Sequence, residues 1–83
     1  MNLIIDIGNS RTKFSLFNRG EVLITVPVDE FLPEHIQVLK DEHPSLNKVI
    51  LSSVKEFPEH LSEALQNHFE TFIELNHETP LPI

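Results

Sequence analysis

The sequence predicts an α/β fold built on a mixed five-stranded sheet, with its elements in the order β-β-β-α-β-α-β. Three observations lead to this prediction. Residues 2–28 hold three apolar runs separated by turn residues, the apolar spacing becomes helical after residue 29, and a short apolar run at 48–54 separates two stretches of helical spacing. Strands that are followed by alternating helices and strands are typical of sheets with both antiparallel and parallel pairs. At 83 residues the chain is expected to form one small domain.

The first three strands are expected at 2–7, 12–18 and 21–28. In the second of them, alternation places Phe14 and Leu16 on one face. Because the turns between the strands are short, the three should pair as an antiparallel meander.

The first helix is expected over residues 29–42. Leu32, Ile36 and Leu39 recur there at the spacing of one helix face. Asp29 is a residue type that often caps the start of a helix, so it is the candidate N-cap.

The second half is expected to place one more helix between two strands. The run "KVILSSV" at 48–54 shows no alternation, which is typical of a strand buried on both faces in a parallel pairing. Pro58 suits the first position of the next helix, whose apolar stripe contains Leu61, Leu65 and Phe69.

A last strand is expected at 71–75, ahead of an extended tail, "NHETPLPI", which two prolines bar from helix. No internal repeat or interdomain linker is apparent in the sequence. Residues 1–83 are therefore read as a single unit.

Composition narrows the class of function. Thirteen acidic and six basic side chains give a net charge of −7 without any basic cluster, so nucleic acid is not an expected partner. The chain has no cysteine, which excludes thiolate catalysis and sulfur-ligated metal and favours a reducing compartment. The N-terminus lacks the features of a signal peptide, and no apolar run approaches the length of a membrane span. We expect a cytoplasmic protein that acts without a membrane.

The turn between the first two strands carries more polar chemistry than a hairpin requires. A phosphate site needs unobstructed backbone N–H groups, a nearby cation and usually an oxygen ligand for Mg²⁺. The stretch "DIGNSRTK" offers all three, and its candidate residues are Asp6, Ile7, Gly8, Asn9, Ser10, Arg11, Thr12 and Lys13. Ligands of open α/β sheets collect at the carboxyl ends of strands, where Asp6 stands. The alternative is an ordinary Asx-type hairpin turn.

The commoner nucleotide and metal motifs are excluded by counting. The Walker and Rossmann loops need two or three closely spaced glycines, whereas this chain has only Gly8 and Gly20. No two histidines are four residues apart, so a metal site on one helix face is not expected.

The Asp-x-Gly turn between antiparallel strands resembles the first phosphate motif of the superfamily that contains sugar kinases, heat-shock chaperones and actin. Together, "DIGNSRTKFSLF", "VILSSV" and "TPLPI" at these separations resemble the opening third of a type III pantothenate kinase. Ser10 stands where that family more often has threonine, which keeps the hydroxyl. The resemblance implies a ribonuclease-H-like domain of the actin-like ATPase type.

The resemblance also implies a reaction, the ATP-dependent phosphorylation of pantothenate to 4′-phosphopantothenate in coenzyme A biosynthesis. Residues 6–13 would form the ATP phosphate loop. In it, Asp6 would act on the phosphates through indirect contact with Mg²⁺, the turn from Gly8 to Ser10 would contact them, and Lys13 would lie near their charge. Enzymes of the family are expected to be homodimers that need Mg²⁺ and a monovalent cation, K⁺ or NH₄⁺.

Two further expectations follow from the resemblance. Ser52 and Ser53, which end the fourth strand, would face the same cleft as the phosphate loop. Family members have two such domains with the active site between them, and the segment after "TPLPI" would carry the pantothenate contacts and the general base. Residues 1–83 are therefore expected to be an N-terminal domain, complete or truncated, with no catalytic residue of its own and with little or no activity alone.

Two alternatives remain open. One is a non-catalytic module of the same fold that binds a nucleotide or a partner protein. The other is part of a different small-molecule kinase of the superfamily.

Overall fold

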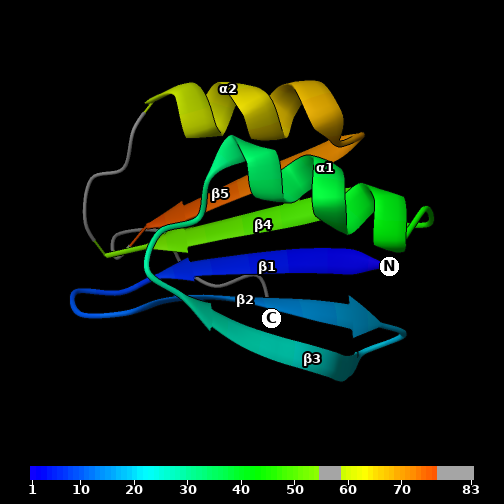
Figure 1. Ribbon diagram of the computed structural model, residues 1–83, viewed down its shortest axis with the longest axis horizontal. Coiled ribbons are helices and arrows are strands. Elements are labelled where there is room, and N and C mark those ends of the chain that lie inside the picture. Colours follow the sequence, from blue (N-terminus) through cyan, green and yellow to red (C-terminus); the bar gives the residue numbers. More distant parts are fainter. Residues whose placement is uncertain (55–58, 77–83) are drawn as a thin grey trace.

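The chain folds into one mixed sheet with strand order β3-β2-β1-β4-β5 (Figure 1). The computed structural model describes residues 1–54 and 59–76. Its elements, in chain order, are β1 (Asn2–Ile7), β2 (Thr12–Asn18), β3 (Glu21–Val28), α1 (Pro33–Glu42), β4 (Lys48–Ser53), α2 (Glu59–His68) and β5 (Thr71–Asn76). The predicted order of elements and the mixed five-stranded sheet are confirmed.

β1 lies at the centre of the sheet and pairs with two different kinds of neighbour. It is antiparallel to β2 and parallel to β4, so that Ile5 lies opposite both Phe14 and Leu51. β2 and β3 are antiparallel, and β4 and β5 are parallel. The first three strands thus form the expected meander, while the two later strands enter the sheet through helical crossovers.

Both helices lie on the same side of the sheet (Figure 1). Alternate residues of β1, β2 and β4 point to that side, and the apolar residues of the two helices meet them in one core. The core includes Leu3, Ile5, Ile7, Phe14, Leu16, Phe31, Ile36, Leu39, Leu46, Val49, Leu51, Leu61, Leu65 and Phe69. Within the described residues, no helix is both long enough and apolar enough to cross a membrane.

The start of α1 differs from the prediction. The helix begins at Pro33, and its N-cap residue is Leu32, so the assignment of Asp29 as the N-cap is wrong. The backbone N–H of Leu32 donates to His35 Nδ1 at 2.8 Å, and the N–H of His35 donates to the carbonyl oxygen of Leu32 at 2.9 Å. An imidazole at the third helical position thus satisfies the backbone where a cap side chain is absent.

The burial of β4 also differs from the prediction. Val49, Leu51 and Ser53 are buried against the helices, whereas Ile50 on the other face is only half-buried. The parallel pairing is confirmed, but burial on both faces is wrong because both helices cover the same face.

The remaining element boundaries fall close to those predicted. β4 ends one residue earlier and β5 one residue later than predicted. Phe69 follows the last residue of α2 and is buried, as the apolar stripe indicated. Pro58 and the tail after residue 76 lie outside the described residues.

Candidate functional site

The turn between β1 and β2 is closed by its own backbone. The N–H of Gly8 donates to the carbonyl oxygen of Arg11 at 2.8 Å. A Cβ atom on residue 8 would lie 3.0 Å from that same oxygen, so a larger residue there would push the turn open. Asn9 and Ser10, at the tip, are exposed. The turn therefore presents its backbone and two small polar side chains to solvent.

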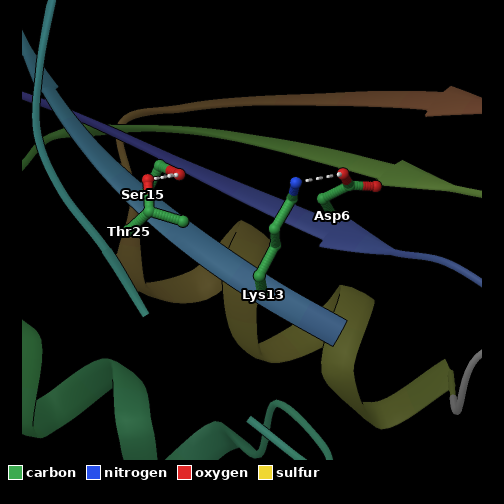
Figure 2. A network of polar contacts seen from close by, with 4 residues as sticks. All are labelled: Asp6, Lys13, Ser15 and Thr25. Atoms are coloured by element: carbon green, nitrogen blue, oxygen red, sulfur yellow. Dashed lines mark hydrogen bonds and ion pairs between the residues drawn. The ribbon is translucent and has the colours of Figure 1, made fainter. Parts of the chain in front are cut away.

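Asp6 and Lys13 stand directly opposite one another on the two strands that lead into this turn. Asp6 occupies a β1 position that points away from the helices, and Figure 2 shows the Lys13 side chain reaching toward it. Lys13 Nζ lies 3.9 Å from Asp6 Oδ2, and the two side chains are 54% and 47% exposed. A pair this exposed contributes little to stability, so both charges are available to a ligand.

The turn and the Asp6–Lys13 pair open into a hollow of about 270 Å³. It is lined by Asp6, Gly8, Asn9, Ser10, Arg11, Thr12, Lys13, Thr25 and Pro27. Seven of the eight residues predicted for the loop are thus brought together, while Ile7 is buried in the helix-side core.

Thr25 and Pro27, which β3 contributes to the hollow, are absent from the predicted site. Pro27 pairs with Lys13 and Thr25 with Ser15 across β2 and β3. The Ser15 and Thr25 hydroxyl oxygens are 2.9 Å apart (Figure 2). Alternation alone could not have indicated them: pairing continued regularly from Asn18 and Glu21 would put Val26 opposite Lys13, and the register shift between Leu16 and Phe17 brings Pro27 there instead.

A second hollow of about 350 Å³ adjoins the first. It is lined by Ser10, Arg11, Thr12, Pro27, Val28 and Asp29. Four residues line both hollows, so the two adjoin along the end of the turn and the neighbouring part of β3: Ser10, Arg11, Thr12 and Pro27.

The two serines at the end of β4 point to opposite faces of the sheet. Ser52 lies opposite Asp6 and is half-exposed, whereas Ser53 lies opposite Ile7 and is buried on the helix side. The N–H of Val54 donates to the carbonyl oxygen of Ile7 at 3.0 Å and fixes this end of the strand. The structure thus puts Ser52, but not Ser53, on the face that carries Asp6 and Lys13. A ligand role for either serine stays a prediction.

The donor groups of the site suit a hard cation that is shared with phosphate. Asp6 supplies a carboxylate, and Asn9 and Ser10 supply neutral oxygens. Among residues 1–54 and 59–76, no group of three or more His, Cys, Asp or Glu side chains is placed to hold a metal ion. Mg²⁺ in nucleotide sites is usually held by one or two carboxylates together with phosphates and water, which matches this set.

The sequence of the chain is similar to part of a known kinase. No protein-family model matches it. Over all 83 residues it is 35% identical to a type III pantothenate kinase from Phocaeicola vulgatus, and it spans 34% of the length of that protein. The similarity relates the chain to the N-terminal part of such an enzyme.

The fold is similar to that of a solved kinase structure. A candidate N-acetylglucosamine kinase from Porphyromonas gingivalis matches 92% of the chain, and 34% of its own length, with a TM-score of 0.64 and 21% identity. At this identity the match shows the fold alone. It confirms the expected fold, a mixed five-stranded α/β sheet of the ribonuclease-H-like, actin-like type.

Proposed function

From the relatedness of this chain to the N-terminal part of a type III pantothenate kinase, we propose that it supplies the ATP-phosphate-binding part of such an enzyme. The reaction would transfer the γ-phosphoryl group of ATP to pantothenate and yield ADP and 4′-phosphopantothenate. The observation that carries the proposal is the half-exposed Asp6–Lys13 pair beside the hairpin turn, over a hollow of about 270 Å³. An ordinary hairpin turn requires neither the charged pair nor the hollow.

The roles of the residues follow from their positions. The backbone of the turn from Gly8 to Ser10 approaches the phosphates because no side chain on residue 8 blocks it. The Lys13 ammonium offsets phosphate charge, and Asp6 orients Mg²⁺ through its water shell. Mg²⁺, held through its water by Asp6, would supply positive charge that offsets the charge developing on the phosphates.

Separating the Lys13 ammonium from the Asp6 carboxylate costs little free energy. At 3.9 Å the two groups are farther apart than a hydrogen bond, and both are about half-exposed. Lys13 can therefore turn to a phosphate while Asp6 turns to the hydrated cation. Ser52, opposite Asp6 in β4, is the nearest further hydroxyl on this face in the strand register.

The rest of the reaction is assigned to a second domain. Residues 1–83 would be the N-terminal domain, and a following domain would carry the pantothenate contacts and the general base. The full enzyme is proposed to be a cytoplasmic homodimer that requires K⁺ or NH₄⁺ in addition to Mg²⁺.

Calorimetric titration with Mg·ATP tests the phosphate site. We expect the wild-type chain to bind weakly, and we expect Asp6→Asn to lower its affinity about tenfold or more because a charged hydrogen-bonding group is lost. Glu63→Gln, an equally conservative change at an exposed position of α2, is the matched control and should bind like the wild type.

Equal affinities of the wild type and Asp6→Asn would contradict the role of Asp6. If neither binds, the same titration on a chain extended past Ile83 separates two cases. Binding that appears only in the extended chain means that the second domain completes the site. Its absence there favours a module that binds a partner protein without nucleotide.

A further inference from the structure

A pair of hydroxyl groups lies at the wall of the hollow beside the hairpin turn. Ser15 in β2 and Thr25 in β3 are cross-strand partners, and their hydroxyl oxygens are 2.9 Å apart (Figure 2). Thr25 lines the hollow together with Asp6 and Lys13, whereas Ser15 stands outside its lining. Neither hydroxyl takes part in the hydrogen bond that closes the turn or in the Asp6–Lys13 pair.

An irregularity in β3 brings Thr25 to this face of the sheet. β3 holds one extra residue, Leu23, where its pairing with β2 shifts register. Regular pairing continued from the start of β3 would put Ile24 opposite Ser15 and would turn Thr25 to the helix side. Bulges of this kind re-aim side chains and are common next to active sites. Here the bulge leaves Leu23 52% exposed and directs a hydroxyl group to the hollow.

The Thr25 hydroxyl suits a ligand that accepts hydrogen bonds. Either hydroxyl of the pair can be the donor to the other. Phosphate oxygens are strong acceptors, so a phosphate in the hollow would favour the arrangement in which Ser15 donates to Thr25 and the Thr25 O–H points to the phosphate. In such a chain of hydrogen bonds, each bond strengthens the next.

We propose that Thr25 binds the phosphate ligand of the hollow through its hydroxyl, and that Ser15 is the positioning residue that holds this hydroxyl in place. Because the contact belongs to the same phosphate hollow, it rests on the proposed function. Three adjacent strands would then contact one ligand, through Asp6 from β1, Lys13 from β2 and Thr25 from β3. The alternative is an ordinary cross-strand hydroxyl pair that only stabilises the sheet.

Titration of the isotope-labelled chain with Mg·ATP, followed by NMR, tests the contact with Thr25. Thr25→Val removes the hydroxyl, keeps the shape of the side chain and suits a strand. It should weaken binding about tenfold, because a hydrogen bond to a charged group is lost. Thr25→Ser keeps the hydroxyl and should bind nearly as well as the wild type. Thr71→Val, the same exchange at an exposed position of β5, is the matched control and should bind like the wild type.

Ser15→Ala tests the positioning role. Alone, this change should weaken binding about threefold, because the Thr25 hydroxyl loses the partner that orients it. Added to Thr25→Val it should have no further effect, since Ser15 acts only through the Thr25 hydroxyl. A pair that only stabilises the sheet would change unfolding in urea and leave the affinity for Mg·ATP as it is. The NMR spectra of the free variants show that each is folded.

The possible results separate this contact from the proposed function. If the wild type binds and a folded Thr25→Val binds equally well, the contact is overturned, while the role of Asp6 is still decided by Asp6→Asn. If the effects of Ser15→Ala and Thr25→Val add in the double variant, the positioning role of Ser15 is overturned. If the wild type binds no Mg·ATP, either as this chain or as a chain extended past Ile83, the contact is overturned together with the proposed function.

Discussion

At the scale of single residues, Gly8 and Gly20 are constrained in different ways. At Gly8 the constraint is space, because a Cβ atom would meet the Arg11 carbonyl oxygen at 3.0 Å. At Gly20 it is the backbone, because φ is +80° and, among the described residues, no neighbouring atom lies within 4 Å of the added Cβ position. Only Gly8 belongs to the proposed phosphate-binding turn, so alanine at the two positions should have different functional effects.

We predict that Gly8→Ala and Gly20→Ala each lower the free energy of unfolding by about 1 kcal/mol. Only Gly8→Ala should also weaken Mg·ATP binding, because it changes the shape of the turn that approaches the phosphates. Urea unfolding and calorimetric titration of both variants measure the two effects. If Gly20→Ala weakened binding as much as Gly8→Ala, the special role of the turn would be refuted.

The contiguous part of the site could be predicted from sequence because a hairpin turn brings neighbours in sequence together in space. Thr25 could not be predicted in this way, since its place depends on the pairing of β3, which includes a register shift. Ser52 and Ser53 are a different case. Successive residues of a strand point to opposite faces of the sheet. The sequence therefore already indicated that the two serines could not both face the same cleft.

At the scale of the helix, α1 shows how a strong local signal can mislead. Asp29 is a favoured capping residue, but the helix starts only at Pro33. Phe31 is buried with its ring 5.7 Å from that of Phe14, and His35 accepts the N–H of Leu32. The packing of Phe31 fixes where the chain enters the helix, and this tertiary contact cannot be read from local sequence.

We predict that His35→Ala lowers the free energy of unfolding by about 1 kcal/mol, because the Leu32 N–H loses its acceptor. His35→Glu should cost less, since a carboxylate at the third helical position can accept the same N–H. His60→Ala, at an exposed position of α2, should be nearly neutral. Urea unfolding of the three variants gives the comparison, and equal losses in His35→Ala and His35→Glu would show that the hydrogen bond contributes nothing.

The prediction for β4 was limited in the same way. A run without alternation indicates parallel pairing, which the structure confirms. It cannot tell how many helices cover each face. That number depends on the whole chain, and here both helices share one side.

At the scale of the whole molecule, the helices and the candidate site occupy opposite faces of the sheet. The helices bury the face with Ile5 and Leu51, while Asp6 and Lys13 project from the other face. The chain spans 34% of the length of the related pantothenate kinase, and under the proposed function it would supply only one side of the active-site cleft.

We therefore predict that the 83-residue chain alone forms no detectable 4′-phosphopantothenate from Mg·ATP and pantothenate. Phosphoryl transfer needs positioning and electrostatic stabilisation from both sides of the transferred group. A radiolabelled phosphate-transfer assay measures it, and the full-length Phocaeicola vulgatus relative is tested alongside as a reference. Typical kinases turn over at about 1 s⁻¹ or faster. Turnover by the chain alone at about a hundredth of that rate or faster would contradict the division of roles between two domains.

The length of the hairpin turn decides whether Asp6 and Lys13 can meet at all. Their pairing requires both the register of β1 with β2 and the residues 8–11 between them. One inserted or deleted residue would shift the alternation and turn the lysine toward the helices. Over evolutionary time, the exposed tip at Asn9 and Ser10 can therefore accept substitutions more readily than insertions or deletions. Among descendants of this sequence, the length of this turn and its Gly8 should therefore stay constant, while the side chains at its tip vary.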